Sequence, residues 1–420
     1  MSSSISLHGV TMDIELQINN SADRGARYVT WAPSPCKIRL TDTTGLTQAA
    51  AVTLSSKSSD TGGNVVFYSS PAGSPAGELT LTLPLNGSSV GFFVGGRFGR
   101  PSLADGDTTI QVRSGTGLIA EVPVMVRIRK DATTLSAEER NRFIAAFARF
   151  NNRGTGRFAD FRNMHTAAGS PEAHGQPGFL PWHRAYLLDL ERELQNIDPS
   201  VTLPYWRFDR PAPGLFTPDF MGESGRLGTV RFSSGNPLQF WVTDGVQGIV
   251  RRPLFDTETE SAIDVLSEDE TIGLGDAFVD FEEMEGNPHG SAHVSFGGSI
   301  SSIPTAAKDP LFFMLHANVD RLWAKWQAQF GRFNPTQGKS FDTNAAGGGN
   351  RIGHNLPDSM WPWNGVTTPP RPSTAPGGGL ANSVCATMPG PRPAVRDCFD
   401  YQGKVTPTSR LGFDYDDVAF

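Results

Sequence analysis

The histidines are the residues of this chain whose types and spacing could do chemistry, because six of the eight stand in two groups of three. The first group is His165, His174 and His183, and the second is His289, His293 and His316. A neutral imidazole is a good ligand for copper, zinc, iron and nickel, and three of them can hold one ion while leaving a coordination position open. The pattern therefore predicts two metal ions.

The first group needs a helix that directs a ligand inward, and the sequence after His183 provides one. We expect a helix over residues 182–197, ended by Pro199, since apolar residues recur along one side of it at Leu187, Leu190 and Leu194. His183 opens this helix on the same side as the leucines. Its imidazole is therefore expected to project toward the interior.

The second group is expected on two further helical segments. His289 and His293 are four residues apart, which is one helical turn with both rings on the same side. His316 lies on an apolar stripe of a helix expected over residues 309–330, with Asp309 as its N-cap and Gly331 beyond its end. Three helices are thus predicted to point histidines toward one interior.

The donor set favours copper over other metals. Any one of these histidines alone would more often be a core or surface residue, but two groups of three argue against coincidence. Cys36, Cys385 and Cys398 show no C-x-x-C spacing and are expected to be buried thiols. Paired cysteines for structural zinc and Glu-x-x-His pairs for a carboxylate-bridged di-iron site are both missing.

The 420 residues predict two domains with different textures. Up to residue 131, short alternating apolar runs recur between glycines, prolines and serines, which is typical of an all-β sandwich. A helical texture then begins: Ser136 and Glu139 form a capping box, and an apolar stripe follows at Phe143, Ile144, Phe147 and Phe150. We expect a β-sandwich-like domain over residues 1–131 and a mainly α catalytic domain over 132–420, with long loops in its glycine- and proline-rich tail.

Charge and hydropathy exclude two classes of partner. The net charge is −7 and there is no long basic block, so nucleic acid is not an expected partner. The first residues contain neither a basic leader nor an apolar run, and no stretch approaches the roughly 18 apolar residues of a membrane helix. These features predict no membrane association and a cytoplasmic location.

Two segments resemble signatures of a known family. The stretch "HGQPGFLPWHRAYLLDLE" is similar to the first copper signature of the tyrosinases, and "DPLFFMLHANVD" is similar to the second. The resemblance covers roughly residues 135–420, and its closing "LGFDYDD" looks like the end of the family's catalytic domain. It implies a binuclear copper centre in a four-helix bundle, with one copper on each histidine group.

The resemblance implies a reaction as well as a cofactor. Members of the family use O2 to oxidise o-diphenols to o-quinones, and some first hydroxylate monophenols at the ortho position. We therefore expect a polyphenol oxidase with phenolic substrates. Two alternatives stay open: a haemocyanin-like O2 carrier that uses the same ligands, and an o-aminophenol oxidase. The identity of the phenol and the oligomeric state are not readable from the sequence.

Residues around the expected site carry roles only through the resemblance. Glu285 corresponds to a carboxylate that holds an activating water, and the usual asparagine after the next histidine is replaced here by Gly290, with Asn287 as a nearby substitute. Because a phenol is protonated at neutral pH, losing that amide is expected to slow monophenol hydroxylation. Val294 and Ile303 stand where the family places residues over the copper, and neither is a large aromatic gate.

Three further positions complete the comparison with the motifs. Glu172 stands where fungal and plant relatives often have a cysteine joined to histidine, so that thioether is not expected here. Arg184 and Asp320 match the motifs and are expected to fix helices and imidazoles. Copper is expected to persist when either of the two remaining histidines, His8 or His354, is replaced.

The resemblance leaves the first 130 residues unexplained. A β domain with no ligand cluster is most often a stabilising or docking module, which is the expected role here. The alternative is a lid over the copper entrance built from loop aromatics such as Phe92, Phe93 or Phe98. For the two phenylalanines in the predicted strand, a core position is the stronger expectation.

Overall fold

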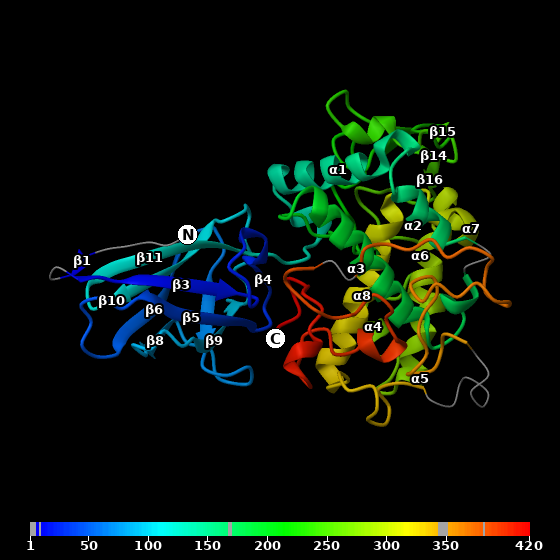
Figure 1. The fold of residues 1–420 in the computed structure, drawn as a ribbon. Coiled ribbons are helices and arrows are strands. Elements are labelled where there is room, and N and C mark those ends of the chain that lie inside the picture. Colours follow the sequence, from blue (N-terminus) through cyan, green and yellow to red (C-terminus); the bar gives the residue numbers. More distant parts are fainter. Residues whose placement is uncertain (1–5, 8–9, 167–169, 343–351, 381–382) are drawn as a thin grey trace. The chain divides into compact units, whose positions relative to one another are not determined.

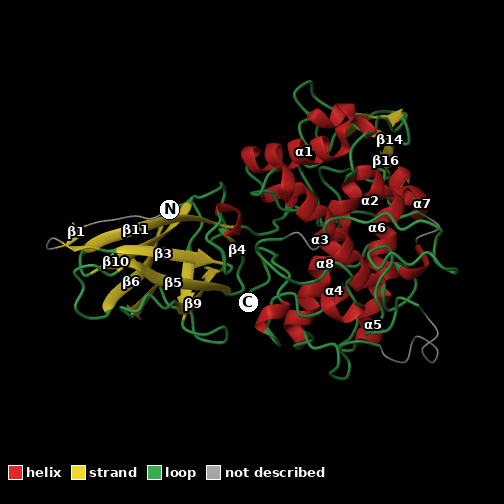
Figure 2. Ribbon diagram, in the orientation of Figure 1, coloured by secondary structure: helices red, strands yellow, loops and turns green. Residues whose placement is uncertain are grey.

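The structure is a computed structural model that describes residues 6–7, 10–166, 170–342, 352–380 and 383–420 (Figure 1). The chain forms two compact units. Unit 1 comprises Met1–Ile128, Ser383–Thr387 and Tyr401–Phe420, and unit 2 comprises Arg129–Asn382 and Met388–Asp400. Strands dominate unit 1 and helices dominate unit 2, as expected from the sequence (Figure 2).

The two larger β-sheets of unit 1 share one apolar core, and β1 and β2 form a separate two-stranded sheet. One sheet has the strand order β4-β11-β10-β6-β8 and the other the order β3-β5-β9-β7. Fully buried residues of both sheets, such as Ile38, Leu54, Phe92 and Val112, belong to the same cluster. The strands are β1 Ser6–Leu7, β2 Val10–Thr11, β3 Asp13–Ile18, β4 Tyr28–Val29, β5 Ser34–Asp42, β6 Ala50–Ser58, β7 Val65–Tyr68, β8 Glu78–Leu83, β9 Val90–Gly96, β10 Thr108–Ser114 and β11 Gly117–Val126, with a short 3-10 turn η1 at Arg24–Ala26.

Alternation of side chains produces this core. In β5, Cys36, Ile38 and Leu40 are buried while Lys37 and Arg39 are exposed, because successive side chains of a strand point to opposite faces. Phe92 of β9 lies opposite Cys36 and is fully buried, as expected for a strand phenylalanine. Phe98, in contrast, is half exposed and packs against Trp31 in an edge-to-face arrangement, with ring centroids 5.6 Å apart.

The end of the chain completes unit 1. The indole N–H of Trp31 donates to the carbonyl of Tyr415 (2.8 Å), and the backbone N–H of Ala32 donates to the Asp414 carboxylate (3.1 Å). The Arg410 guanidinium donates to the hydroxyl of Ser34 (3.2 Å). The segment that looks like the end of the catalytic domain in the sequence therefore packs with the β unit instead.

Unit 2 is mainly helical, with short two- and three-residue strands between the helices. None of the helices in the described part of the chain is long and apolar enough to cross a membrane. Its α-helices are α1 Ala137–Asn151, α2 Phe158–Met164, α3 Phe179–Ile197, α4 Glu268–Ile272, α5 Phe278–Phe281, α6 Ser291–Val294, α7 Ile303–Ala306 and α8 Leu311–Phe330. Its strands are β12 Glu223–Ser224, β13 Val230–Arg231, β14 Val242–Thr243, β15 Val246–Gln247, β16 Arg251–Pro253 and β17 Phe296–Gly298.

Short tight turns join these elements, most of them of 3-10 type. They are η2 Ala132–Thr134, η3 Asn152–Gly154, η4 Ser170–Glu172, η5 Pro237–Phe240, η6 Glu282–Glu285, the π turn η7 Gly286–Gly290, η8 Ser299–Ser301, η9 Val395–Cys398 and η10 Pro407–Ser409, the last of which lies in unit 1.

Helix ends follow the sequence signals with two corrections. The capping box of Ser136 and Glu139 begins α1, and Gly331 ends α8 with φ 67°, a conformation that favours glycine. Helix α3 begins at Phe179, earlier than predicted, because Pro181 falls in the first turn, where no backbone donor is needed. Asp309 is not the N-cap residue of α8, although its carboxylate accepts the N–H of Leu311 (3.0 Å).

Candidate metal centre

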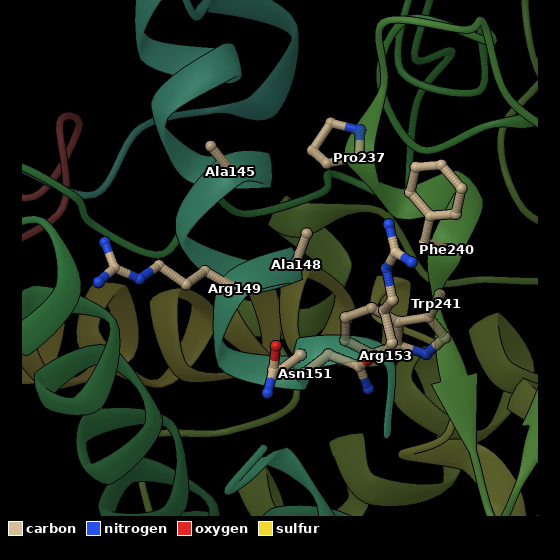
Figure 3. A pocket seen from close by; sticks show the side chains of 9 residues that line it. Ala145, Ala148, Arg149, Asn151, Arg153, Pro237, Phe240 and Trp241 are labelled. Atoms are coloured by element: carbon tan, nitrogen blue, oxygen red, sulfur yellow. The ribbon is translucent and has the colours of Figure 1, made fainter. Parts of the chain in front are cut away.

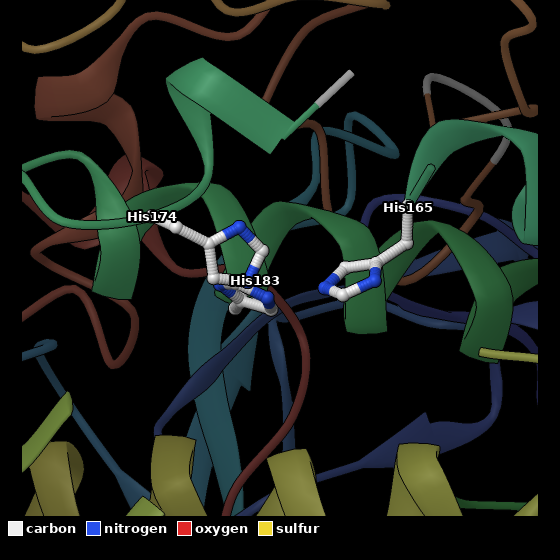
Figure 4. Close-up of side chains that lie close together, drawn as sticks. All are labelled: His165, His174 and His183. Atoms are coloured by element: carbon white, nitrogen blue, oxygen red, sulfur yellow. The ribbon is translucent and has the colours of Figure 1, made fainter. Parts of the chain in front are cut away.

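The first histidine group converges in the structure (Figure 4). His165 caps the C-terminus of α2, His174 lies on the loop before α3, and His183 is on α3 itself. Their rings point toward one another, with centroids 4.8 to 5.5 Å apart. One potential ligand atom from each residue lies within 4.8 Å of the others, so the three can share one ion.

The second group converges in the same way. His289 is on the π turn η7, His293 on α6 and His316 on α8. The Nε2 atom of His316 lies 3.3 Å from that of His289 and 3.1 Å from that of His293. Three imidazole nitrogens this close together mark a point at which a cation would be coordinated.

The two groups are neighbours. The rings of His183 and His316 are stacked with centroids 4.3 Å apart, and those of His165 and His316 are 6.1 Å apart. Helices α3 and α8 therefore bring one ligand of each group into contact. Two ions held by these groups would be close enough to act on one small molecule.

Backbone carbonyls orient four of the six imidazoles through Nδ1. His165 bonds to the carbonyl of Ile303 (3.1 Å), His183 to Phe179 (2.9 Å), His289 to Glu285 (2.8 Å) and His293 to Ile300 (2.7 Å). A carbonyl only accepts, so each Nδ1 carries the proton and each Nε2 presents a lone pair. This is the arrangement that a metal-binding histidine requires.

The unpaired nitrogens of the site fit a metal. Within the described residues, Nε2 of His165 and Nε2 of His183 are buried without a hydrogen-bond partner. Burial and neighbouring imidazoles lower the pKa of both rings well below the usual value, and burial lowers the pKa of His293 to about 4. A buried unpaired polar atom is costly, whereas a neutral imidazole with a free lone pair is a ligand. The donors are all imidazole, which fits copper.

A cavity of about 470 Å³ opens onto both groups. Its walls include four of the non-ligand residues named from the resemblance: Glu285, Gly290, Val294 and Ile303. Val294 is 62% exposed and Ile303 45%, so aliphatic side chains stand at a solvent-accessible part of the cavity. An aromatic ring fits a space of this size.

Glu285 faces this cavity but already has a partner. Its carboxylate accepts the backbone N–H of Gly175, with distances of 2.7 and 3.0 Å to the two oxygens. Burial raises the pKa of Glu285 to about 7, although this hydrogen bond opposes the rise. The group is therefore poised to exchange a proton near neutral pH and also ties the loop that carries His174.

Gly290 leaves room for a side chain, but Asn287 does not supply the missing amide. A Cβ atom on Gly290 would meet only the carbonyl of Glu285, at 3.4 Å. Asn287 accepts the N–H of Leu266 (2.8 Å) and donates to the carbonyl of Asp264 (2.8 Å). Both groups of its amide thus contact a separate loop, and Asn287 is not among the residues that line the cavity, which argues against the expectation that it assists at the site.

Arg184 and Asp320 pair with each other rather than with imidazoles. The Arg184 guanidinium donates to the Asp320 carboxylate (2.6 Å) and to the carbonyl of Cys398 (2.8 Å). The other oxygen of Asp320 accepts from Arg129 (3.1 Å). The pair is fully buried and ties α3 to α8, so it positions the histidines through their helices.

Two aromatic residues at the site have no counterpart in the predicted set. Phe312 packs against His316 (4.2 Å between centroids) and His165 (4.6 Å), and Phe179 against His183 (4.7 Å) and His289 (4.9 Å). Each phenylalanine lies four residues before a ligand, so helical spacing could have indicated it. Both contact histidines of both groups.

Of the two remaining histidines, only His354 lies in the part of the chain that the structure describes. His8 falls outside the described residues. His354 is buried and bonds to the backbone at Pro171 and Gly178, on either side of the loop that carries His174. It is therefore a neighbour of the first group without belonging to it.

A second hollow of about 300 Å³ lies between α1 and η5 (Figure 3). Arg153 stacks over the exposed ring of Phe240, with 4.4 Å from the guanidinium carbon to the ring centroid. The lining contains no histidine, cysteine or carboxylate. This hollow is therefore unsuited to metal or acid–base chemistry, and the histidine cavity is the candidate site.

Comparisons with known proteins agree with this geometry. A family model for the common central domain of tyrosinase matches residues 155–271 and 256–329. A tyrosinase of Streptomyces glaucescens is 37% identical over 268 residues, which cover 56% of this chain and 92% of that protein. A tyrosinase of Streptomyces antibioticus is 34% identical over 272 residues, covering 57% and 94%. A G-type haemocyanin of Enteroctopus dofleini, units Oda to Odg, is 30% identical over 231 residues, covering 48% of this chain and 8% of that protein.

Proposed function

Because the chain belongs to the tyrosinase family, we propose that it is a polyphenol oxidase that uses O2 to oxidise o-diphenols to o-quinones. The two histidine groups hold two copper ions, one on His165, His174 and His183 and one on His289, His293 and His316. The observation that carries the proposal is the contact between the groups, in which His183 and His316 stack at 4.3 Å. We also propose that α2, α3, the η7–α6 segment and α8 form a four-helix bundle around the coppers.

The reaction balances over two substrates. Each o-diphenol gives up two electrons and two protons as it becomes an o-quinone, and two such oxidations reduce one O2 to two waters. When bound, the copper ions supply the site at which O2 takes up these electrons. The residues of the chain must admit the ring, orient it and accept its protons.

The cavity is suited to admit a ring. Its exposed aliphatic residues, Val294 and Ile303, leave the approach without a large aromatic side chain. The carbonyls of Phe179, Glu285 and Ile300 keep the imidazoles fixed as the ring approaches. Little reorganisation is then needed at the moment of reaction.

Glu285 is the proposed base for a monophenol. Its place in the cavity wall and a pKa near 7 support this role, since a base poised near the working pH removes a phenol proton most effectively. Gly290 provides no amide to share the task, and Asn287 is engaged elsewhere. We therefore propose that monophenols are hydroxylated more slowly than o-diphenols are oxidised.

Turnover separates this enzyme from a carrier. Copper-loaded protein is mixed with catechol and O2, and quinone is followed by its absorbance while bound copper is counted. We expect two coppers per chain and catalytic quinone formation. Reversible O2 binding without quinone would leave only the haemocyanin-like reading, which has less support because the tyrosinases match over most of their length.

A comparison of substrates distinguishes the polyphenol oxidase from the remaining alternative, an o-aminophenol oxidase. Catechol, tyrosine and an o-aminophenol, assayed with one preparation, rank the three activities at a single site. An o-aminophenol consumed far faster than catechol would favour the o-aminophenol oxidase. A cytoplasmic location and the lack of nucleic-acid or membrane partners stay predictions from the sequence.

A further inference from the structure

Among the six ligands, His174 has the least support from its own backbone. The other five lie within helical elements or, for His165, at a helix cap, whereas His174 is on an irregular loop and is only half-buried. Gly175, directly after it, has φ +67° and is exposed. Something outside this loop must hold His174 if the first copper is to stay bound.

His354 bridges the two sides of the loop. Its Nε2 donates to the carbonyl of Pro171 (3.0 Å), and its Nδ1 accepts the backbone N–H of Gly178 (3.1 Å). These two residues stand three before and four after His174. Gly178 is also the N-cap residue of α3, so His354 pairs an N–H that has no carbonyl within the helix.

Glu172 makes a second connection to the same distant segment. Its carboxylate accepts from the Arg371 guanidinium (2.5 Å) and from the backbone N–H of Trp361 (3.0 Å). The side chain of Glu172 is 8% exposed and that of Arg371 11%, so solvent screens this ion pair weakly. Glu172, which stands where fungal and plant relatives often have a cysteine joined to histidine, therefore makes a buried ionic contact instead.

Two glycines permit this close approach. A Cβ atom on Gly178 would lie 2.5 Å from Nδ1 of His354, and one on Gly353 would lie 2.4 Å from the Glu172 carboxylate. Gly353 also has φ +87°. The turn that presents His354 is fixed by Asp358, whose carboxylate accepts the N–H groups of Gly353 (3.0 Å) and Asn355 (3.1 Å).

We propose that His354, Glu172 and Arg371 form a clamp that positions the loop bearing His174. The clamp slows the loss of the copper ion held by the first histidine group. The inference rests on the copper centre proposed above. All three are positioning residues, because their contacts are with backbone groups or with one another. The clamp joins residues 171–178 to residues 354–371, which lie far apart in the sequence.

The test follows copper release from the full-length, copper-loaded protein into excess EDTA. The His354→Ala variant should still bind two coppers, as expected from the sequence, but one of them should leave into EDTA about 10- to 100-fold faster, matching the loss of metal affinity that follows removal of a partner that orients a ligand. The other copper should leave at the wild-type rate. His354→Asn keeps an acceptor for Gly178, and His354→Gln keeps a donor for Pro171, so both should fall between alanine and wild type.

A matched control separates positioning from general destabilisation. The buried Asn236 donates to the carbonyls of Pro218 (3.0 Å) and Phe220 (2.7 Å) and so fixes a different loop of unit 2. Asn236→Ala should leave both release rates close to wild type. Two outcomes would overturn the clamp. One is copper release from His354→Ala at the wild-type rate. The other is faster release of both coppers, to the same extent in His354→Ala as in Asn236→Ala.

Amide exchange in the wild-type chain covers the case in which His354→Ala does not fold. We expect the N–H of Gly178 to exchange slowly, because His354 accepts it in a buried position. Exchange as fast as that of an exposed amide would refute the clamp without any variant. A wild-type protein that binds fewer than two coppers would instead refute the proposed function, so the two failures are distinguishable.

Discussion

The two histidine groups differ in how their backbone is held. In the second group, all three ligands lie within a helical element, and their Nε2 atoms already approach to 3.1 and 3.3 Å. In the first group, His165 caps a helix and His174 lies on a loop. Local helical structure thus assembles most of the second site, whereas the first depends on segments distant in the sequence.

This difference indicates which metal ligands depend on contacts from outside their own segment. A helix fixes the direction of its side chains through its own hydrogen bonds, so a ligand on a helix needs only a correct rotamer and an Nδ1 partner. A loop has no such internal hydrogen bonds, so its ligand must be held by contacts from other segments of the chain. The N–H of Gly175 bonded to Glu285 and the contacts of His354 and Glu172 provide that support here.

The largest effect on copper content and turnover is expected from two single variants, each of which removes one ligand from a different histidine group. His183→Ala and His289→Ala should each retain one copper instead of two and lose o-diphenol turnover by roughly a thousandfold or more, about 4 kcal/mol of barrier, since both ions must act together. Metal analysis and a catechol assay measure both effects. Full activity in either variant would contradict the ligand assignment.

The same pair of variants tests the comparison itself. The copper left in His289→Ala belongs to the first group, and the copper left in His183→Ala belongs to the second. We expect EDTA to remove the former faster. Equal rates would show that the loop position of His174 has no consequence for metal retention.

The next effect concerns the ion pair that ties the two groups together. Asp320→Asn leaves the buried guanidinium groups of Arg129 and Arg184 without this carboxylate, and breaking a buried pair costs about 3 to 5 kcal/mol of unfolding free energy. Denaturant unfolding measures it. As a control, Glu15→Gln breaks a solvent-exposed pair with Arg39 in unit 1 and should cost about 1 kcal/mol or less.

A pH effect on stability is expected from α3, the helix that carries His183. Burial raises the pKa of Asp189 to about 7, although the indole N–H of Trp363 opposes the rise. Between the normal pKa of an aspartate and 7, the folded state binds a proton that the unfolded state does not. As the pH rises through this window, the free energy of unfolding should therefore fall by roughly 1.4 kcal/mol per pH unit. Above pH 7 it should level off.

Asp189→Asn isolates that contribution. The variant should show a shallower decline in the free energy of unfolding between about pH 4 and pH 7 than wild type, because its amide does not titrate. Denaturant unfolding at several pH values gives the slopes. Identical slopes in the two proteins would mean that Asp189 is ionised in the folded state.

The smallest effect is expected at the second group, where Gly290 follows His289. Gly290→Asn restores an amide beside Glu285 and should raise the ratio of monophenol to diphenol turnover by about tenfold, the effect of one added hydrogen bond of about 1.4 kcal/mol. A side chain has room there. Gly290→Ala adds bulk without the amide and should leave the ratio unchanged; a similar rise in both variants would exclude the amide as the cause.

Local signals in the sequence predicted several of the helix ends, but they did not predict which distant residues the side chains contact. The capping box of Ser136 and Glu139 and the glycine end of α8 were confirmed, because both depend on residues a few positions apart. Asn287 was expected at the active site from its proximity in sequence. It turned out to hold residues 264–266, which no spacing rule reveals.

The boundary of unit 1 shows the same limit. Alternating apolar residues predicted the strands of the β region, but its composition does not show that residues 401–420 join it. Trp31, Ala32 and Ser34 bond to that C-terminal segment. Deleting residues 1–131 would leave the segment without these partners, so we expect the shortened chain to lose stability, in line with a stabilising role for the β region.

The sequence by itself determined the metal chemistry of this protein, because six imidazoles in two groups are a property of residue type and spacing. Only the tertiary structure decided how they are held. The carbonyls of Ile303 and Ile300 orient ligands on other elements, and His354 reaches the loop of His174 from far along the chain. Backbone carbonyls have no side-chain identity, and contacts across long separations leave no period in the sequence, so folding alone brings these partners together.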